Sequence, residues 1–364
     1  MRDPADDPGV RRIPAPALKG AVARLFTAAG CDATEAAQVA DGLVEANLYG
    51  HDSHGIGLVP TYLSNLRLEL VRPGQHIRVV ADYGAILGLD GHKGFGQAIG
   101  EEAMNLAVER ARVTGIALVG LANTHHLARI GRWGEQCAAA GFASIHFVNV
   151  LAQPLVAPFG GLDARLATDP FCVAVPHAPH PLVLDCATST VAYGKVRVAY
   201  DAGRRLAPGT IIDAQGRPTD DPAAMCGDPM GALLPFGGHK GFALAVMCEL
   251  LGGALSGGQV QDRRPQPSPM INNMLSIVFA PDKLCAADEF ARQVERLAAW
   301  LRGSPQPAVG DGIHLPGEPE RIAARERERT GIPLPRPTRE ALAGCARTLG
   351  TGDADLFLLP TETP

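Results

Sequence analysis

The clearest indication of the fold lies in residues 116–150, which read IALVGLANTHHLARIGRWGEQCAAAGFASIHFVNV. The apolar run Ile116–Leu121 predicts a buried strand, and the apolar spacing over about Ile130–Ala140 predicts a helix. A second strand is expected at Ser144–Val150. Strand, helix and strand in this order predict a mixed α/β layer structure.

The same alternation continues on both sides of this stretch. A helix over about Gln97–Val113 precedes it, and two short apolar runs, His76–Ala81 and Ala85–Leu89, predict a strand pair before that helix. Further strands are expected at Phe171–Val175, Leu182–Asp185 and Leu275–Ala280. Helices are expected at Ala15–Ala29, from a Thr34 cap to Val44, and at Thr61–Leu70, Phe242–Leu255, Ala287–Leu301, Glu320–Arg329 and Arg339–Leu349. Surface loops are expected at Gly203–Pro235 and Gln259–Pro269.

Composition places the chain among folded globular proteins. Apolar residues make up 46% of its 364 residues and charged residues 20%, which excludes wholesale disorder. The net charge of −5 and the lack of a basic block argue against a nucleic-acid partner. No apolar run reaches the roughly 18 residues that span a bilayer, and Met1–Arg12 lacks the apolar core of a signal peptide. We therefore expect a soluble, cytoplasmic protein without membrane contact.

A glycine-rich segment, Gly94–Gly100, is similar to a dinucleotide-binding fingerprint but departs from it. Its spacing is G-x-G-x-x-x-G, and Asp90–Lys93 separate it from the preceding strand. No acidic residue ends a second strand about 20 residues further on. We therefore interpret it as a glycine turn before a helix, so any dinucleotide must be held by an arrangement other than the Rossmann fold.

Two histidine-rich motifs carry side chains suited to proton transfer. His51–Gly55 (HDSHG) follows a predicted helix, and a histidine beside a serine suits proton transfer because the unperturbed imidazole pKa is about 6.5. The alternative is a polar helix C-terminus. Asn123–Arg129 (NTHHLAR) lies at the carboxyl end of a buried strand, a place typical of ligand sites in α/β sheets. Metal binding is the rival interpretation there, although adjacent histidines rarely chelate one ion.

Three later segments could hold an anionic cofactor. Asp185 ends a predicted strand, which suits a ribose-binding carboxylate or a helix cap, and Lys195 follows ten residues later. Gly237–Gly241 (GGHKG) opens an apolar helix, where backbone N–H groups favour an anion. Leu315–Glu318 (LPGE) forms a tight turn ahead of an Arg-rich helix. The eight cysteines show no CxxC spacing and are expected to be reduced, so no metal cage is predicted.

These segments, in this order, resemble the malate/L-lactate dehydrogenase type 2 family over about Ala15–Leu349. The most specific matches are Gly50–Gly57 and His125–Val150, followed by Leu184–Ser189 and Leu315–Glu318. Within the family, the chain is most similar to the hydroxycarboxylate dehydrogenase B branch, whose members reduce phenylpyruvate-like 2-oxo acids. The resemblance implies a family-specific α/β fold, with a mixed, largely antiparallel sheet and flanking helices, unrelated to the Rossmann fold.

The resemblance also implies an activity and an assembly. The enzyme would transfer a hydride between NAD or NADP and a 2-oxo acid to give a 2-hydroxy acid, as a homodimer with its site near the subunit interface. Residues 1–115 would form a helical cap and strand pair, serving substrate binding and dimerisation and joined by C-terminal helices at 319–355. Residues 116–318 would form the cofactor-binding lobe, and residues 356–364 a flexible tail.

The family motifs imply roles for individual residues. His54, oriented by Ser53, would be the general acid that protonates the carbonyl oxygen, and His126 matches a second family histidine described as a proton acceptor in some members. Cofactor contacts are implied for Leu127, Ala128, Arg129, Leu182, Leu184, Asp185, Cys186, Lys195, His239, Lys240, Asn272, Pro316, Gly317 and Glu318.

Three departures from the family pattern affect the expected pocket. Leu58 stands where many relatives carry an arginine that pairs with the substrate carboxylate, so Arg129 becomes the candidate carboxylate anchor. Cofactor phosphate is the alternative partner for Arg129. Leu58 also favours a bulky apolar 2-oxo acid over oxaloacetate. Asp169 stands where relatives carry an asparagine, and Ala128 where they carry a glycine.

Other functions stay open at this point. On the same scaffold, the enzyme could reduce a cyclic imino acid or act as a ureidoglycolate-type dehydrogenase. From different classes, it could be a metal-dependent hydrolase using His51, His54, His125 and His126, or a catalytically silent binding protein. The choice of 2-oxo acid, the stereochemistry and the preference for NAD or NADP are not encoded in a readable pattern.

Overall fold

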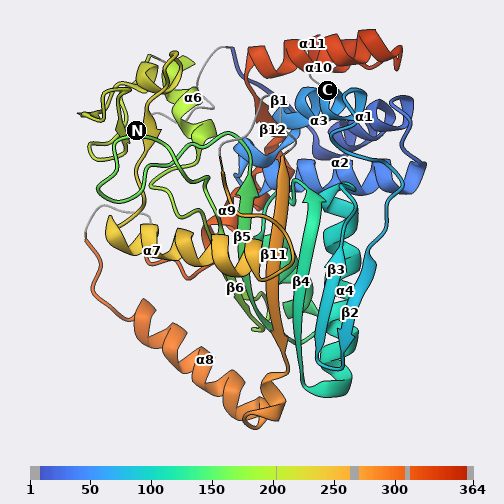
Figure 1. Cartoon of the computed structure of the whole chain (residues 1–364), viewed down its shortest axis with the longest axis vertical. Coiled ribbons are helices and arrows are strands. Elements are labelled where there is room, and N and C mark those ends of the chain that lie inside the picture. The colour runs from blue at the N-terminus through green and yellow to red at the C-terminus, as the bar shows by residue number, and fades with distance from the viewer. Residues whose placement is uncertain (1–8, 202, 263–269, 308–311, 359–364) are drawn as a thin grey trace.

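A computed structural model describes residues 9–201, 203–262, 270–307 and 312–358. Its main layer is a seven-stranded sheet in the order β2-β3-β4-β11-β5-β6-β7 (Figure 1). The strands are β2 (Arg78–Tyr83), β3 (Ile86–Asp90), β4 (Ile116–His125), β5 (Ala143–Leu151), β6 (Phe171–Val175), β7 (Leu182–Cys186) and β11 (Ile271–Phe279). Only the β3–β4 pair is parallel among these seven strands. The mixed, largely antiparallel sheet predicted from the sequence is thereby confirmed.

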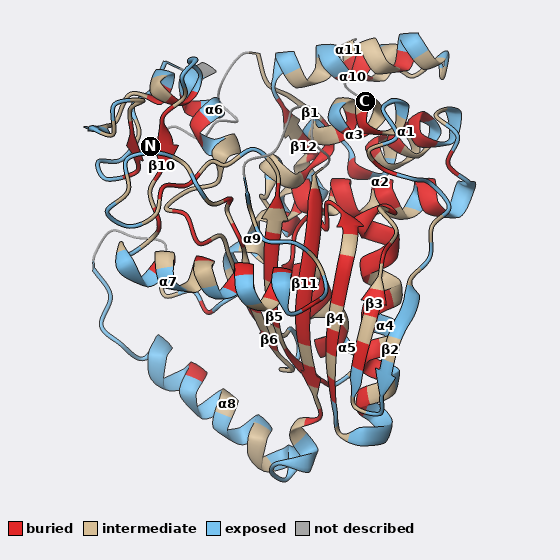
Figure 2. Ribbon diagram, in the orientation of Figure 1, coloured by how far each residue is buried: buried red, intermediate tan, exposed pale blue. Residues whose placement is uncertain are grey.

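The central strands β4 and β11 are largely buried (Figure 2), because helices cover both faces of this sheet. On one face, α4 (Gly96–Thr114) packs against β4, and α5 (Gly131–Ala139) packs against β5 and β6. The other face is covered by a π-helical segment, Cys248–Ala254, which continues α7 (His239–Met247) and packs against β5 and β11. The predicted helix Phe242–Leu255 thus begins three residues earlier and changes its winding at Cys248.

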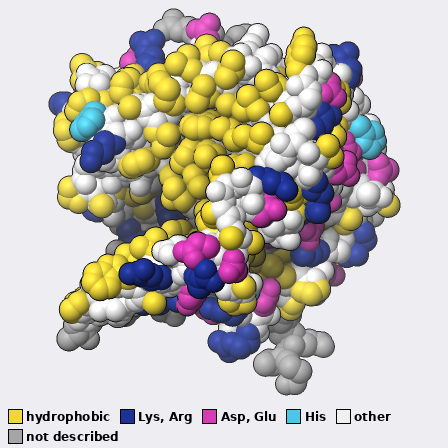
Figure 3. Space-filling model, turned by 90° about the horizontal axis from the view of Figure 1, so that it is seen from below, with side chains coloured by type: hydrophobic (Ala, Val, Ile, Leu, Met, Phe, Trp, Pro, Cys, Tyr) yellow, Lys and Arg dark blue, Asp and Glu magenta, His cyan; other side chains and the backbone are white. Residues whose placement is uncertain are grey.

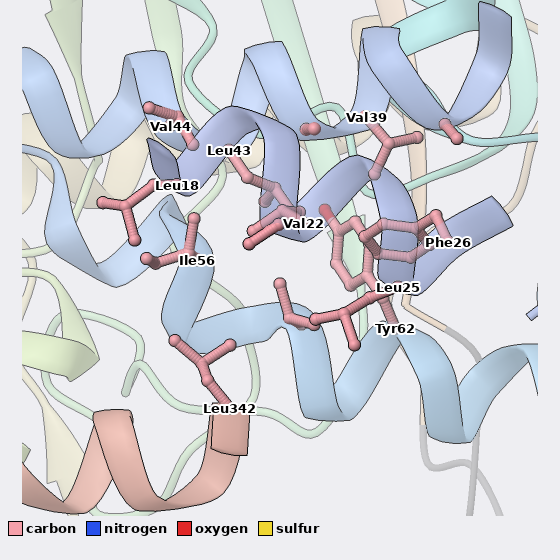
Figure 4. Close-up of a cluster of buried hydrophobic side chains, with 14 of the residues drawn as sticks. Leu18, Val22, Leu25, Phe26, Val39, Leu43, Val44, Ile56, Tyr62 and Leu342 are labelled. Atoms are coloured by element: carbon pink, nitrogen blue, oxygen red, sulfur yellow. The ribbon is translucent and has the colours of Figure 1, made fainter. Parts of the chain in front are cut away.

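A helical cap stands at one end of the sheet. It comprises α1 (Ala15–Ala28), α2 (Ala33–Leu48), α3 (Val59–Arg67), α10 (Arg336–Leu349) and α11 (Ala354–Leu358), together with the strand pair β1 (Arg11–Ile13) and β12 (Ile332–Leu334). Leucine, valine and phenylalanine side chains from α1 and α2 interlock with Tyr62 of α3 and Leu342 of α10 (Figure 4). The C-terminal helices therefore return to the N-terminal lobe.

The structure corrects several local expectations. Asp32, rather than Thr34, caps α2, since its carboxylate accepts hydrogen bonds from the N–H groups of Thr34 and Glu35. Phe357 of α11 is fully buried in the cap core, so this part of the predicted flexible tail is packed. Residues 359–364 lie outside the described residues.

The segment Gly203–Pro235 is not made of loops alone. It forms a small three-stranded sheet from β8 (Ile211–Ile212), β9 (Pro218–Thr219) and β10 (Ala232–Leu233), next to α6 (Tyr193–Asp201). Its strands are only two residues long, too short for a sequence pattern to mark them. Of the predicted loop 259–269, only residues 259–262 are among those described.

Two further helices connect these parts of the molecule. α8 (Ala287–Arg302) extends away from the body, and α9 (Glu318–Thr330) leads back to the cap (Figure 1). Over the described residues, no helix is both long and apolar enough to cross a membrane.

Candidate active site

His54 lies in a short 3-10 turn, Asp52–His54, between α2 and α3. Two residues hold this turn in place: the Asn47 side chain donates to the Asp52 carboxylate over 2.6 Å, and Arg327 of α9 donates to both oxygens of the same carboxylate. A Cβ atom at Gly55 would overlap the Asn47 side chain, which explains the glycine after the histidine. The histidine is therefore fixed by its own loop and by the C-terminal segment.

Two imidazole rings face each other at this turn. The Ser53 hydroxyl lies 2.9 Å from Nδ1 of His54, and the rings of His54 and His126 stack with centroids 5.4 Å apart. Desolvation, with the nearby His51 and Arg129, lowers the pKa of His54 to about 4. Desolvation, with His54 and His125, also holds the pKa of His126 well below its ordinary value. Both imidazoles are therefore neutral near pH 7, and their proximity disfavours protonation of both at once.

A second layer of polar side chains supports these histidines. The Tyr62 hydroxyl lies 2.7 Å from Nδ1 of His126 and accepts a hydrogen bond from Gln97 over 3.2 Å. Asn65 contacts Nε2 of His125 over 3.0 Å, and the His125 ring is fully buried. Sequence reasoning missed Tyr62, Gln97 and Asn65, because their spacing in helices is that of ordinary core residues.

The segment between His126 and α5 is closely fixed by its neighbours. Asn272 accepts from the N–H of Leu127 over 2.7 Å, and Asp185 accepts from the N–H of Gly131 over 2.7 Å. Ala128 has a φ of 58°, a conformation that glycine adopts more readily. Within the described residues, the backbone N–H groups of residues 128–130 donate no hydrogen bond, although all three residues are buried. Such groups favour an anionic ligand.

The two terminal nitrogens of Arg129 pair with Glu135, whereas its buried Nε has no hydrogen-bond partner among the described residues. Its side chain is 2% exposed and pairs with both oxygens of Glu135, one of them over 3.2 Å. Its guanidinium also stacks on the Tyr49 ring, 4.2 Å from the centroid. This geometry supports a positioning role for Arg129 better than the predicted role of carboxylate anchor. Leu58 packs against the cap core.

The remaining predicted segments are linked to this site by backbone contacts. The N–H of Val183 in β7 donates to the carbonyl of Pro316 over 3.1 Å, which brings the strand Leu182–Cys186 beside the turn Pro316–Glu318. Glu318 itself pairs with Arg302. Gly194 packs so closely on Ser53 that a Cβ there would lie 2.5 Å from the serine Cβ. Lys195 follows on α6 and is exposed.

The lysine motif at the start of α7 is joined to the end of β7. The N–H of Phe236 donates to the carbonyl of Thr188 over 3.0 Å. His239 and Lys240 are exposed, and the His239 ring lies 5.9 Å from that of Phe159. The structure therefore joins this motif to the neighbourhood of Asp185 without bringing either side chain into contact with the histidine pair.

The four histidines of the hydrolase alternative do not converge. His51 is directed at Glu320, with 3.7 Å between Nε2 and Oε1, and His125 is enclosed by Asn65 and the rings of Tyr62 and Phe95. In the part of the chain that the structure describes, no three His, Cys, Asp or Glu side chains are grouped to hold a metal ion. The geometry thus gives no support to that alternative.

Comparison with known proteins gives a family assignment. The model of the malate/L-lactate dehydrogenase family matches residues 13–343. The chain belongs to this family. It is 45% identical over 349 residues to hydroxycarboxylate dehydrogenase B of Escherichia coli strain K12, covering 95% of this chain and 96% of that protein. It is 43% identical over 287 residues to L-lactate dehydrogenase of Cupriavidus necator, covering 78% and 82%.

Solved structures of the malate/L-lactate dehydrogenase family share the fold. The sulfolactate dehydrogenase of Methanocaldococcus jannaschii superposes with a TM-score of 0.84 at 30% identity, covering 93% of this chain and 98% of that one. An E. coli structure described as a malate/lactate dehydrogenase superposes with a TM-score of 0.91 at 44% identity, covering 95% and 98%. The predicted family and its non-Rossmann fold are both confirmed.

This family member contains a buried pair of carboxyl groups. Asp169 is fully buried, and its Oδ1 accepts from the N–H of Val150 over 3.0 Å, whereas its Oδ2 has no N–H donor among the described residues. Glu249, in the π-helical segment, lies beside it and accepts from the N–H of Gln261 over 2.6 Å. Desolvation and the negative charge of Glu249 hold the pKa of Asp169 well above its ordinary value, so burial favours the protonated form of Asp169.

Replacement of Asp169 by asparagine should therefore stabilise the fold at alkaline pH. The raised pKa means that the folded state holds a proton that the unfolded chain releases above about pH 4. Stability of the unaltered protein should thus fall as pH rises, whereas the amide introduced by Asp169→Asn donates to Glu249 at any pH. We expect Asp169→Asn to gain about 1–3 kcal/mol at pH 8 and less at pH 5, measured by urea unfolding. The reciprocal Glu249→Gln should act alike, and a loss of stability in both variants at pH 8 would contradict a cost of burying the two carboxylates together.

Proposed function

We propose that the chain is a nicotinamide-dependent dehydrogenase that interconverts a 2-hydroxy acid and the corresponding 2-oxo acid. The observation that carries the proposal is the Ser53–His54 pair stacked on His126, beside three unpartnered backbone N–H groups at residues 128–130. The hydroxycarboxylate and L-lactate dehydrogenases similar to this chain support the reaction class. Leu58 in place of a cation supports an apolar 2-oxo acid of the phenylpyruvate type.

The residues present fit a dinucleotide. The N–H groups of residues 128–130 suit a phosphate, and the Asp185 carboxylate, on the strand Leu182–Cys186 next to Pro316–Glu318, suits ribose hydroxyls. The exposed Lys195 and Lys240, together with His239, add positive or polar groups around this region. Asn272 contributes indirectly, since it holds the turn at Leu127. Either NAD or NADP is compatible with this set.

The protein's own groups can carry the proton of the reaction. A bound nicotinamide supplies or accepts the hydride. In the oxidation direction, neutral His54 accepts the hydroxyl proton of the 2-hydroxy acid, and Ser53 keeps the ring oriented through Nδ1. In the reduction direction, protonated His54 returns that proton to the carbonyl oxygen. An anionic substrate favours this protonated form, because opposite charges close together stabilise each other.

The two directions should have opposite pH dependences. Because the pKa of His54 is about 4, its neutral form dominates above that pH, and kcat/KM for 2-hydroxy acid oxidation should fall only below about pH 5. For 2-oxo acid reduction, kcat/KM should decrease as pH rises, by about tenfold per unit above the pKa while protonation of His54 is limiting. Initial rates in both directions between pH 4 and 9 test this. An oxidation rate that is lost on acidification from pH 8 to pH 6 would contradict it.

The proposed reaction is tested by a substrate panel. Consumption of NADH and of NADPH should be followed by absorbance with phenylpyruvate, pyruvate, oxaloacetate and 2-oxoglutarate, and with a cyclic imino acid. We expect turnover of at least one 2-oxo acid. Turnover of the imine alone would favour the imino acid reductase alternative. Calorimetry that detects binding of neither reduced nucleotide would overturn the proposal and favour a silent binding protein.

The expected homodimer is supported by an apolar face on α8. Leu297, Trp300 and Leu301 on this helix are 56%, 79% and 43% exposed, an unusual exposure for such side chains in a monomer. Figure 3 views the molecule from below and shows a broad area of apolar side chains on this side of the molecule. A second copy of the chain is the proposed partner. Light scattering should give twice 38.1 kDa, and Trp300→Lys should shift the mass towards that of one chain.

A further inference from the structure

A buried chain of hydrogen bonds ends at His126. The side-chain N–H of Gln97 donates to the Tyr62 oxygen over 3.2 Å, and the Tyr62 hydroxyl lies 2.7 Å from Nδ1 of His126. Tyr62 is fully buried in the cap core, where its ring makes edge contacts with Phe26 (Figure 4). The tyrosine is therefore held rigidly, with its hydroxyl directed at the imidazole.

This chain determines which nitrogen of His126 carries the proton. The Tyr62 oxygen already accepts from Gln97, so its own hydrogen must find an acceptor, because a buried hydroxyl hydrogen left unpaired is costly to the folded state. Nδ1 of His126 is the acceptor within reach, at 2.7 Å. A neutral imidazole has one N–H and one bare nitrogen. With Nδ1 accepting from Tyr62, the proton of His126 resides on Nε2.

The environment also keeps His126 neutral. It is 7% exposed, and His54 and His125 lie beside it, so a positive charge on its ring would be poorly solvated and repelled by a charged neighbour. At the backbone, α4 approaches so closely that a Cβ at Gly96 would overlap the His126 carbonyl oxygen. The backbone that carries the ring is therefore closely packed, and little solvent reaches the ring itself.

We propose that Tyr62 is a positioning residue that locks His126 in its Nε2–H tautomer, which makes His126 a neutral hydrogen-bond donor to the substrate oxygen. In this arrangement His126 cannot accept the substrate proton, because its bare nitrogen is occupied by the tyrosine. His54 alone then exchanges the proton, while His126 stabilises the negative charge that develops on the oxygen. The inference rests on the proposed function for its kinetic consequence, but the tautomer itself is a property of the free protein.

The tautomer is tested by nitrogen NMR of the protein labelled with ¹⁵N-histidine. Protonated and bare ring nitrogens resonate in separate ranges, and His126→Gln identifies the resonances of this residue by their loss. We expect Nε2 of His126 to be protonated and Nδ1 to be bare between pH 6 and 8. Tyr62→Phe should shift Nδ1 and mix the tautomers. Tyr193→Phe, which removes a hydroxyl bonded to the Met225 carbonyl, is the matched control and should leave His126 unchanged.

The donor role is tested by three substitutions at His126. The amide N–H of glutamine reaches the position of Nε2, whereas that of asparagine reaches only Nδ1. A donor role predicts that His126→Gln retains at least about tenfold more kcat than His126→Ala, the equivalent of one hydrogen bond, and that His126→Asn behaves like the alanine variant. In His126→Gln, kcat/KM for 2-hydroxy acid oxidation should still fall at low pH, since protonation of His54 causes that fall.

Two results would overturn the inference. One is a proton on Nδ1 of His126 in the unaltered protein. The other is a His126→Gln enzyme that is as slow as His126→Ala and whose kcat/KM for oxidation no longer falls at low pH. This result would make His126 the base. If the unaltered protein turned over no substrate with either nucleotide, the proposed function would fail, yet the NMR measurement would still decide the tautomer. Should Tyr62→Phe not fold, the His126 series and the unaltered spectrum suffice.

Discussion

Replacement of His54 by alanine should lower kcat by about 10²–10⁴-fold in both directions, the usual loss when a general acid–base group is removed. The effect is expected to fall on kcat rather than on nucleotide binding, because His54 sits on the turn Asp52–His54, whereas the proposed phosphate-binding N–H groups belong to residues 128–130. Steady-state rates with a saturating 2-oxo acid, together with NADH titration by fluorescence, measure the two quantities separately.

The matched control for this variant is His76→Gln. His76 is exposed and pairs with Glu102, away from the histidine pair, so its loss should leave kcat unchanged. Ser53→Ala should lower kcat by about tenfold, a loss between those of the other two variants, because it removes one orienting hydrogen bond and leaves the imidazole. Near-normal turnover in His54→Ala would move the proton transfer to another group and contradict both the mechanism and the inference about His126.

Much of the fold could be predicted because its elements follow simple periodicities. The strand Phe171–Val175 was predicted at its exact bounds, since its five residues form a short continuous apolar run. β4 was predicted too short, because its last residues, Asn123–His125, are polar and do not alternate. Their place in the sheet depends on β11, where the Asn273 side chain accepts from the N–H of Asn123 at a break in the strand register. Such a contact, 150 positions apart, leaves no local signal.

In the candidate site, too, some residues could be predicted from the sequence and others could not. Ser53, His54, His126 and Asp185 were predicted as site residues because their residue types and their places after helices or strands suit the proposed chemistry. Tyr62 and Gln97 were missed, because a tyrosine or glutamine at helical spacing is typical of a core or a surface and its partner lies 64 or 35 positions away. The glycines of the segment Gly94–Gly100 were correctly predicted to form a turn and the start of a helix. The structure adds their reason: Gly96 packs on His126 and Gly100 on Trp133.

Arg129 shows why the role of a charged side chain depends on surroundings that its residue type does not reveal. A guanidinium next to a histidine motif is the natural partner for a carboxylate, and its 2% exposure is not visible in the sequence. Its partner Glu135 lies six positions away, a spacing that no helix or strand pattern associates with pairing. Desolvation raises the pKa of Glu135, and Arg129 opposes that rise, so the carboxylate depends on this arginine for its charge.

Replacement of Arg129 by methionine should therefore destabilise the fold by about 3–5 kcal/mol at pH 8, because it leaves a buried carboxylate without a partner. The loss should be smaller at pH 5, where Glu135 can take up a proton. Glu45, 3.9 Å from Arg129, stays paired with Arg132 over 2.6 Å, so the damage is confined to Glu135. Urea unfolding at the two pH values measures both effects.

The double variant Arg129→Met with Glu135→Leu separates positioning from substrate binding. Replacing both partners by apolar residues of similar size should restore most of the lost stability, as it does for other buried ion pairs. If Arg129 only holds the turn before α5, this variant should bind 2-oxo acids with a KM within about threefold of the original, a difference of less than about 1 kcal/mol. A KM raised by a hundredfold in a stable double variant, with nucleotide affinity unchanged, would instead establish Arg129 as the carboxylate anchor. A lowered nucleotide affinity with an unchanged KM for the 2-oxo acid would instead indicate that Arg129 binds the cofactor phosphate.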